Sequence, residues 1–159
     1  MRTVEGELRG RGRRIAIVAA RFNGLVVQRL VEGADACLRK YEVADDDIDL
    51  VWVPGCFELP MVAERLAASG DRDAVICLGA VIRGETAHFE YVANAAASGI
   101  REASRRTGVP VIFGVLTTDT LDQAMDRAGG AHGNKGWDAA QAGLEMAGLL
   151  ESLPKEGSS

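Results

Sequence analysis

Four runs of apolar, β-rich residues alternate along the chain with stretches in which apolar residues recur at every third or fourth position. The runs are Ile15–Ala20, Ile48–Val53, Ala74–Ala80 and Val111–Leu116. They are nearly unbroken, a pattern typical of strands that helices cover on both faces. A strand followed by a helix four times predicts a three-layer α/β/α sandwich, with the four-stranded parallel sheet and right-handed crossovers of flavodoxin-like folds.

The stretches with helical periodicity predict five helices. Thr3–Leu8 predicts one more strand, and because a small sheet has two open edges, we expect this strand to pair with a neighbouring subunit. Residues 1–159 are expected to form one domain, with an N-terminal arm over about 1–12 and a frayed tail over about 153–159. The expected helices run from Val27 to Tyr41, from Leu59 to Leu66, from Phe89 to Thr107, from an N-cap at Asp119 to Gly129-Gly130, and from Trp137 to Glu151.

Composition narrows the class of protein. The net charge of −5 disfavours a nucleic-acid partner, so we interpret the basic run Arg9–Arg14 as solvated charge. Cys37, Cys56 and Cys77 cannot all pair within one chain, which favours a reducing compartment and hence the cytoplasm. The amino terminus carries acids where a signal peptide would be apolar, and no apolar run approaches the ~20 residues that span a bilayer, so no membrane role is expected.

The richest candidate segment is Arg83–His88, beyond the third run, because open parallel sheets bind ligands past the carboxyl ends of their strands. Gly84 permits unusual backbone angles, so Glu85 and Thr86 would present their amides at the start of the next helix, where a phosphate is favoured. His88, in the same first turn, would move protons near neutral pH. The alternative is an exposed histidine that only caps the helix.

Phe22 and Phe57 each follow a strand and either stack on a planar ring or close the top of the core. Glu58 either accepts hydrogen bonds from hydroxyl groups or is an ordinary acid at a helix start. The sequence contains neither G-x-x-x-x-G-K-[ST] nor G-x-S-x-G, the motifs of triphosphate cradles and of serine nucleophiles. His88 and His132 lie far apart with no pair of cysteines nearby, so we expect no metal site.

Six short motifs lie in order along the chain. They are Arg21-Phe22-Asn23, Pro54–Pro60, Gly79–Phe89, Gly114–Thr118, Asp126–Gly129 and Gly133–Gly136. Together they resemble the 6,7-dimethyl-8-ribityllumazine synthase family, which acts in riboflavin biosynthesis. Each motif alone is weak, whereas six in register, over about residues 3 to 151, are specific.

The resemblance implies an enzyme that condenses 5-amino-6-(D-ribitylamino)uracil with 3,4-dihydroxy-2-butanone 4-phosphate, releasing phosphate and water, without a metal or redox cofactor. His88 would be the proton-transfer group, and Glu85 and Thr86 would hold the phosphate through their amides. Phe22 would stack on the pyrimidine, with Ala80, Val81 and Ile82 along the ring edge and Cys56, Phe57 and Glu58 against the ribityl chain.

The resemblance also implies that an adjacent subunit completes each site. That subunit would supply Phe113 and Lys135 to the pyrimidine and Arg127 to the phosphate, with Asp138 orienting Arg127. Cys56 stands where the family more often has alanine, and its thiol adds a risk of oxidation.

The short connection from Gly129 to Gly136 resembles that of family members that assemble twelve pentamers into a 60-subunit shell, with riboflavin synthase as a candidate cargo. Two other classes stay open: a relative that only binds flavins or lumazines, and a shell that chiefly contains cargo.

Overall fold

The computed structural model describes residues 1–155 and confirms the predicted parallel sheet. The strands lie in the order β2-β1-β3-β4, and every neighbouring pair is parallel. The third and fourth strands each extend two residues beyond their predicted carboxyl ends. The strands are β1 (Ile15–Ala20), β2 (Ile48–Val53), β3 (Ala74–Ile82) and β4 (Val111–Thr118).

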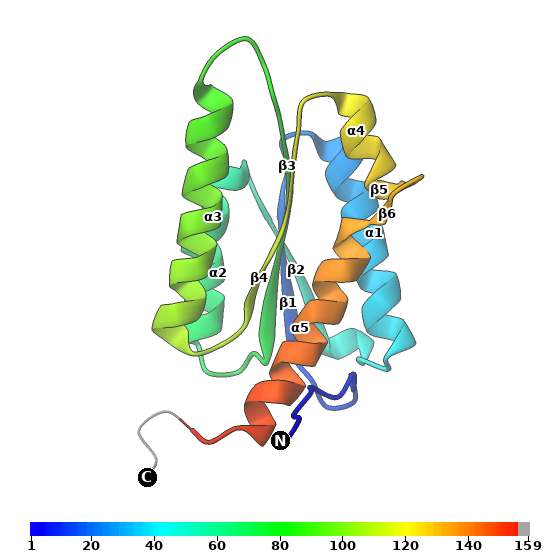
Figure 1. Ribbon diagram of the computed structural model, residues 1–159, viewed down its shortest axis with the longest axis vertical. Coiled ribbons are helices and arrows are strands. Elements are labelled where there is room, and N and C mark those ends of the chain that lie inside the picture. Colours follow the sequence, from blue (N-terminus) through cyan, green and yellow to red (C-terminus); the bar gives the residue numbers. More distant parts are fainter. Residues whose placement is uncertain (156–159) are drawn as a thin grey trace.

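Helices cover both faces of the sheet, which makes the predicted three layers (Figure 1). One face packs against α1 (Gly24–Lys40), α4 (Leu121–Asp126) and α5 (Lys135–Ser152). The other face packs against α2 (Leu59–Ala68) and α3 (His88–Thr107). Two short 3-10 turns, η1 (Asp45–Asp47) and η2 (Cys56–Glu58), precede β2 and α2. Because β1 is central, all of its residues are buried.

The start and end of α4 differ from the prediction. Its N-cap is Thr120 rather than Asp119, because the Thr120 hydroxyl accepts from the Gln123 amide at 3.1 Å while the Gln123 side chain accepts from the Thr120 amide. The helix ends at Asp126, well before Gly129-Gly130. The chain then forms a hairpin of β5 (Ala128–Gly130) and β6 (Gly133–Asn134), and Asn134 caps the start of α5.

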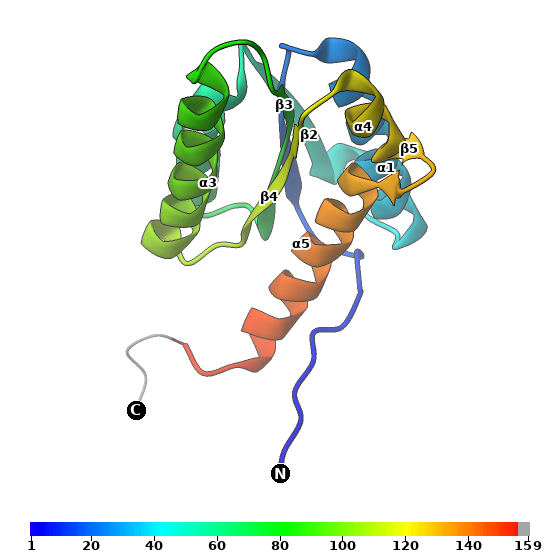
Figure 2. The ribbon, with the colours of Figure 1, turned by 45° about the horizontal axis from the view of Figure 1, so that its top comes forward.

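The amino-terminal segment forms no strand within residues 1–155 of this one chain. It runs beside the second half of α5, so close that a side chain at Gly6 would overlap Glu145, and Figure 2 shows it leaving the domain below that helix. No described residue pairs with the outer edge of β2, where Leu50 and Trp52 are exposed. Pairing of Thr3–Leu8 with a second copy therefore stays a prediction. Of the tail expected to fray, residues 156–159 lie outside the described residues.

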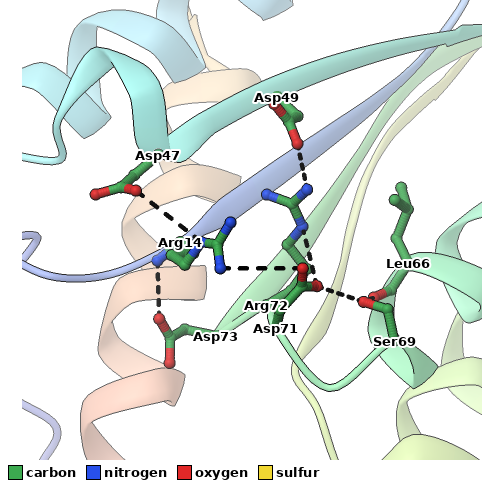
Figure 3. Close-up of polar contacts among 8 residues, drawn as sticks. All are labelled: Arg14, Asp47, Asp49, Leu66, Ser69, Asp71, Arg72 and Asp73. Atoms are coloured by element: carbon green, nitrogen blue, oxygen red, sulfur yellow. Dashed lines mark hydrogen bonds and ion pairs between the residues drawn. The ribbon is translucent and has the colours of Figure 1, made fainter.

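Ion pairs close the amino ends of the strands. The amide of Arg14 donates to Asp73 at 2.8 Å, and its guanidinium lies 4.0 Å from Asp47 and 3.9 Å from Asp71 (Figure 3). Arg72 pairs with Asp49 at the start of β2. The starts of three strands are therefore tied together at this end of the molecule.

The basic run Arg9–Arg14 is exposed at Arg9, Arg11 and Arg14, as predicted, but not at Arg13. Arg13 is only 7% exposed and donates to Glu151 at the end of α5 at 2.5 Å. Arg9, Arg11 and Arg14 also have acidic partners. These ion pairs connect the segment that precedes β1 to neighbouring elements, including η1 and the end of α5. Among residues 1–155, the helices are all too short or too polar to cross a bilayer.

Candidate functional site

The carboxyl ends of the strands lie at the top of Figure 1. They border a hollow of about 730 Å³. The loops after β1, β2 and β3 and the first turns of α3 form its walls, as expected for an open parallel sheet. Most of the residues predicted to bind substrate meet here. The lining consists of Phe22, Asn23, Pro54, Gly55, Cys56, Phe57, Glu58, Ala80, Val81, Ile82, Gly84, Thr86, His88, Phe89 and Val92.

Two aromatic rings of this hollow are presented to solvent. Phe22 is 72% exposed and Phe57 is 64% exposed, so neither ring closes the core. Asn23, which directly follows Phe22, has a left-handed backbone, and its side-chain amide donates to the Ala80 carbonyl at 2.8 Å. This bond ties the loop that carries Phe22 to the end of β3. The rings are thus available to a flat ligand above Ala80.

The floor of the hollow holds a buried thiol. Cys56 is 5% exposed, and burial raises the pKa of its thiol to about 11. Its sulfur occupies the space that a side chain at Gly79 would need. Because thiolates are the species that oxidise readily, the oxidation risk predicted for Cys56 is not supported by its surroundings.

The loop between β3 and α3 differs from its prediction in two respects. The helix begins at His88 with Ala87 as its N-cap, so Glu85 and Thr86 precede the first turn instead of forming it. Gly84 has no positive φ, and a Cβ there would meet nothing within 4 Å, so this backbone does not require glycine. The amides of Glu85 and Thr86 nevertheless have no hydrogen-bond partner in residues 1–155 and remain free to bind an anion.

His88 and Glu58 are open to a ligand. His88 is exposed, and its imidazole makes no hydrogen bond within the described part of the chain, so it does not cap the helix. Glu58 is the N-cap residue of α2 but makes no capping hydrogen bond. The hollow therefore combines a group able to transfer protons with a carboxylate that can accept hydrogen bonds from hydroxyl groups.

A second hollow, of about 530 Å³, lies between the edge strand β4, α3 and α4. Phe113 and Arg127 line it, and neither lines the first hollow. Arg127 follows α4 as its C-cap, and its guanidinium donates to the Gln123 carbonyl at 2.9 Å. Phe89 lines both hollows, so it stands in the wall between them. Two of the residues predicted to act from an adjacent subunit, Phe113 and Arg127, thus lie apart from the first hollow.

Three of the predicted residues, Glu85, Lys135 and Asp138, line neither hollow. Lys135 begins α5, and its amide donates to the Arg127 carbonyl at 2.8 Å across the β5–β6 hairpin. Asp138 lies in the first turn of α5, and no ion pair joins it to Arg127 within residues 1–155. Its orienting role stays a prediction, as does the role of Glu85.

Sequence reasoning assigned no role to Asn23, Phe89 and Val92, all of which line the first hollow. Phe89 and Val92 follow His88 by one and four positions on α3, and a residue four positions on shares a helix face. That spacing is a signal that could have found Val92. The hydrogen bond from Asn23 to Ala80 joins residues that are 57 positions apart, so no local sequence pattern could predict it.

The flavodoxin-like strand order and this open sheet end define an α/β protein whose site can hold a flat ring, a chain of hydroxyl groups and an anion. A family model described as 6,7-dimethyl-8-ribityllumazine synthase matches residues 12–151, and the chain belongs to this family. It is an enzyme of riboflavin biosynthesis, and the resemblance drawn from its six motifs is confirmed.

Proposed function

We propose that the family's condensation takes place at a site that two copies of this chain build together. The observation that carries this proposal is the separation of the two hollows, because Phe113 and Arg127 lie beyond Phe89 from the hollow of His88. A second copy that presents its own Phe113 and Arg127 to the first hollow would complete the set. In a ring, every subunit presents its Phe113 and Arg127 to one neighbour, and its own first hollow is completed by the other neighbour.

The first hollow would bind 5-amino-6-(D-ribitylamino)uracil. The exposed ring of Phe22 stacks on the pyrimidine above Ala80, Val81 and Ile82. The ribityl hydroxyls donate hydrogen bonds to the carboxylate of Glu58, which makes no capping hydrogen bond of its own. Cys56 and Phe57 lie beside it. The neighbour's Phe113 and Lys135 cover the open side of the pyrimidine.

The free amides of Glu85 and Thr86 would bind the phosphate of 3,4-dihydroxy-2-butanone 4-phosphate. The neighbour's Arg127 adds a planar fork of donors that suits two phosphate oxygens. In the chain described, that guanidinium donates only to the Gln123 carbonyl, which leaves it other donors for a ligand.

The chemistry needs little beyond positioning, which can supply about 7–11 kcal/mol in favourable cases. The pyrimidine amine is itself the nucleophile and forms an imine at the ketone with loss of water. Phosphate is then eliminated toward the amides and the guanidinium. The ribityl-bearing amine attacks the remaining carbonyl, and loss of a second water closes the ring of the product. His88 moves the protons, a contribution of typically 10²–10⁴-fold, so His88→Ala should slow turnover without abolishing it.

We further propose that the subunits form pentamers and that twelve pentamers form a 60-subunit shell, with riboflavin synthase as a candidate cargo. The compact β5–β6 hairpin leaves only a short connection between Arg127 and α5, as in the family members that form shells. The unpaired edge of β2 offers a place for the neighbour's Thr3–Leu8. The three free thiols support a cytoplasmic location.

Mixing two variants tests the shared site. His88→Ala and Arg127→Ala are each assayed by lumazine absorbance, then unfolded together and reassembled in equal amounts. A shared site restores activity well above either variant alone, because about a quarter of the interfaces in a mixed ring pair an intact His88 with an intact Arg127.

The outcomes separate the alternatives. Mixed assemblies no more active than their parents would show that each chain carries its own complete site. A wild-type chain that binds both substrates but makes no product would be a binding relative. Large particles by light scattering, without product, would indicate a container.

A further inference from the structure

Arg83 makes three side-chain contacts at the boundary between the two hollows. Its Nε donates to an Asp119 carboxylate oxygen at 2.8 Å, and its guanidinium carbon lies 4.5 Å from the centre of the Phe89 ring. A terminal nitrogen also lies 3.6 Å from Glu90. The backbone amide of Arg83 donates to the Thr118 carbonyl at 2.8 Å. A single side chain thus joins the end of β3, the end of β4 and the first turn of α3.

The loop from Gly84 to Ala87 has little else to hold it. Its backbone hydrogen bonds within residues 1–155 are local ones to the start of α3, and its residues are exposed. This loop carries the free amides of Glu85 and Thr86 and leads into His88. Phe89 directly follows His88, so whatever fixes the Phe89 ring also fixes the first turn that presents the imidazole.

We propose that Arg83 is a positioning residue for the phosphate-binding loop and for His88. By stacking on Phe89 while bonding to Asp119, it holds this loop at a fixed place above the end of β4. The inference rests on the proposed site, because it assigns Arg83 to the same reaction. Arg83 touches neither substrate in this scheme and acts through the residues that do.

The chemistry of the side chain explains why arginine is needed. An exposed ion pair contributes little on its own, and Arg83 is 48% exposed. Only a planar guanidinium can lie over a ring and donate at its edge to a carboxylate in the same arrangement. A lysine in its place would keep the charge but lose one of the two contacts.

The test is Arg83→Lys, with steady-state constants measured for both substrates. We expect kcat to fall about ten- to hundredfold, because small displacements of reacting groups cost rate steeply. The KM for the butanone phosphate should rise, and the KM for the pyrimidine should stay near that of the wild type. Asp119→Asn should change the same constants in the same direction by a smaller factor.

Arg105→Lys is the matched control. Arg105 lies on α3 in an exposed ion pair with Glu102 at 2.6 Å, far along the helix from His88. Its substitution should leave all constants unchanged. The melting temperature of each variant is recorded so that a loss of folded protein is not mistaken for a loss of rate.

A double-variant cycle with His88→Ala separates positioning from general structural support. If Arg83 acts through His88, Arg83→Lys should lower kcat much less in the His88→Ala background than in the wild type. An equal loss in both backgrounds, or an Arg83→Lys variant with unchanged constants, overturns the inference while leaving the proposed function intact. A wild-type chain that forms no lumazine overturns the proposed function instead.

Discussion

Beside the first hollow, Gly79 has to be small because of Cys56. A Cβ at Gly79 would overlap the Cys56 sulfur, whereas its next neighbours, Ala20 and Leu59, would lie at 3.5 Å. Those two distances are ordinary contacts, so the thiol alone excludes a side chain at Gly79. The glycine and the cysteine must therefore be considered together.

We predict that Gly79→Ala lowers the free energy of unfolding by about 1–3 kcal/mol, the usual cost of overpacking a core. Cys56→Ala should remove most of that loss when combined with it, because the obstructing atom is gone. Denaturant unfolding of the two single variants and the double variant measures the coupling. Strictly additive effects would show that the clash with Cys56 is not the cause. Cys56→Ala alone should stay active.

The raised pKa of Cys56 predicts that its thiol reacts slowly with alkylating reagents near neutral pH. Because only the thiolate reacts, alkylation by iodoacetamide should be slow at pH 7 and should rise about tenfold per pH unit, without a plateau, up to pH 9. Burial raises the pKa to about 11, which places the plateau above that range. Mass spectrometry identifies the modified residue, and Cys56→Ala provides the control. A plateau below pH 9 would contradict the prediction.

Single residues show how far the sequence could predict the site. Phe22, Phe57 and His88 were expected at the carboxyl ends of strands and lie there, because the ends of parallel strands meet at one edge. Gly84 was expected to use the backbone freedom of glycine, yet it has no positive φ. The roles of Asn23 and Arg83 depend on partners 57 and 36 positions away, and local patterns carry no information about such partners.

At the scale of elements, unbroken apolar runs located all four strands of the sheet, because burial on both faces leaves a strong signal. The β5–β6 hairpin was missed, since strands of three and two residues are too short to show a period. The cap of α4 was placed one residue early because Asp119 and Thr120 are both good caps, and Gln123 decides between them.

The ion pairs of α3 predict how stability changes with acid. Hydrogen bonds from Arg105 and Arg106 lower the pKa of Glu102 from 4.5 to about 2. A carboxylate whose pKa is lower in the folded state stabilises the fold above its unfolded pKa, and this contribution is lost as pH falls through the folded value. We expect Glu102→Gln to be less stable than the wild type at pH 6, with the difference vanishing toward pH 2.

Measurement of the free energy of unfolding of both chains across this range tests the sign. Both partners of Glu102 lie on α3 itself, so the effect reports on ion pairs within this helix. A difference that grows as pH falls would contradict the assignment.

At the scale of the whole molecule, the proposed site and the proposed assembly depend on each other. Within residues 1–155, the chain has an unpaired strand edge at β2, an extended segment at its amino terminus and two hollows on different sides of Phe89. In the proposed assembly, a second copy would complete each of these features. The family resemblance implied residues of both hollows, but how copies meet is a property of surfaces that no single segment encodes.

Two proline variants test the pairing of the amino-terminal segment with a neighbour. Proline removes a backbone donor and is tolerated in a strand only where that donor faces solvent. Successive residues of an edge strand turn their amides to opposite sides, so only one of Val4→Pro and Glu5→Pro should disrupt pairing with β2. Neither amide bonds within residues 1–155, so the fold of one copy should tolerate both changes.

We expect the disruptive variant to shift light scattering toward smaller particles and to lose lumazine formation in parallel, because a copy without its neighbour has only half of a site. The other variant serves as its control and should assemble and react as the wild type does. Circular dichroism should show the same secondary structure in both variants. If both variants assemble and react normally, Thr3–Leu8 does not pair with β2 of a neighbour. If the particles fall to single chains while activity per chain is unchanged, the site is complete within one copy and the shared-site proposal fails.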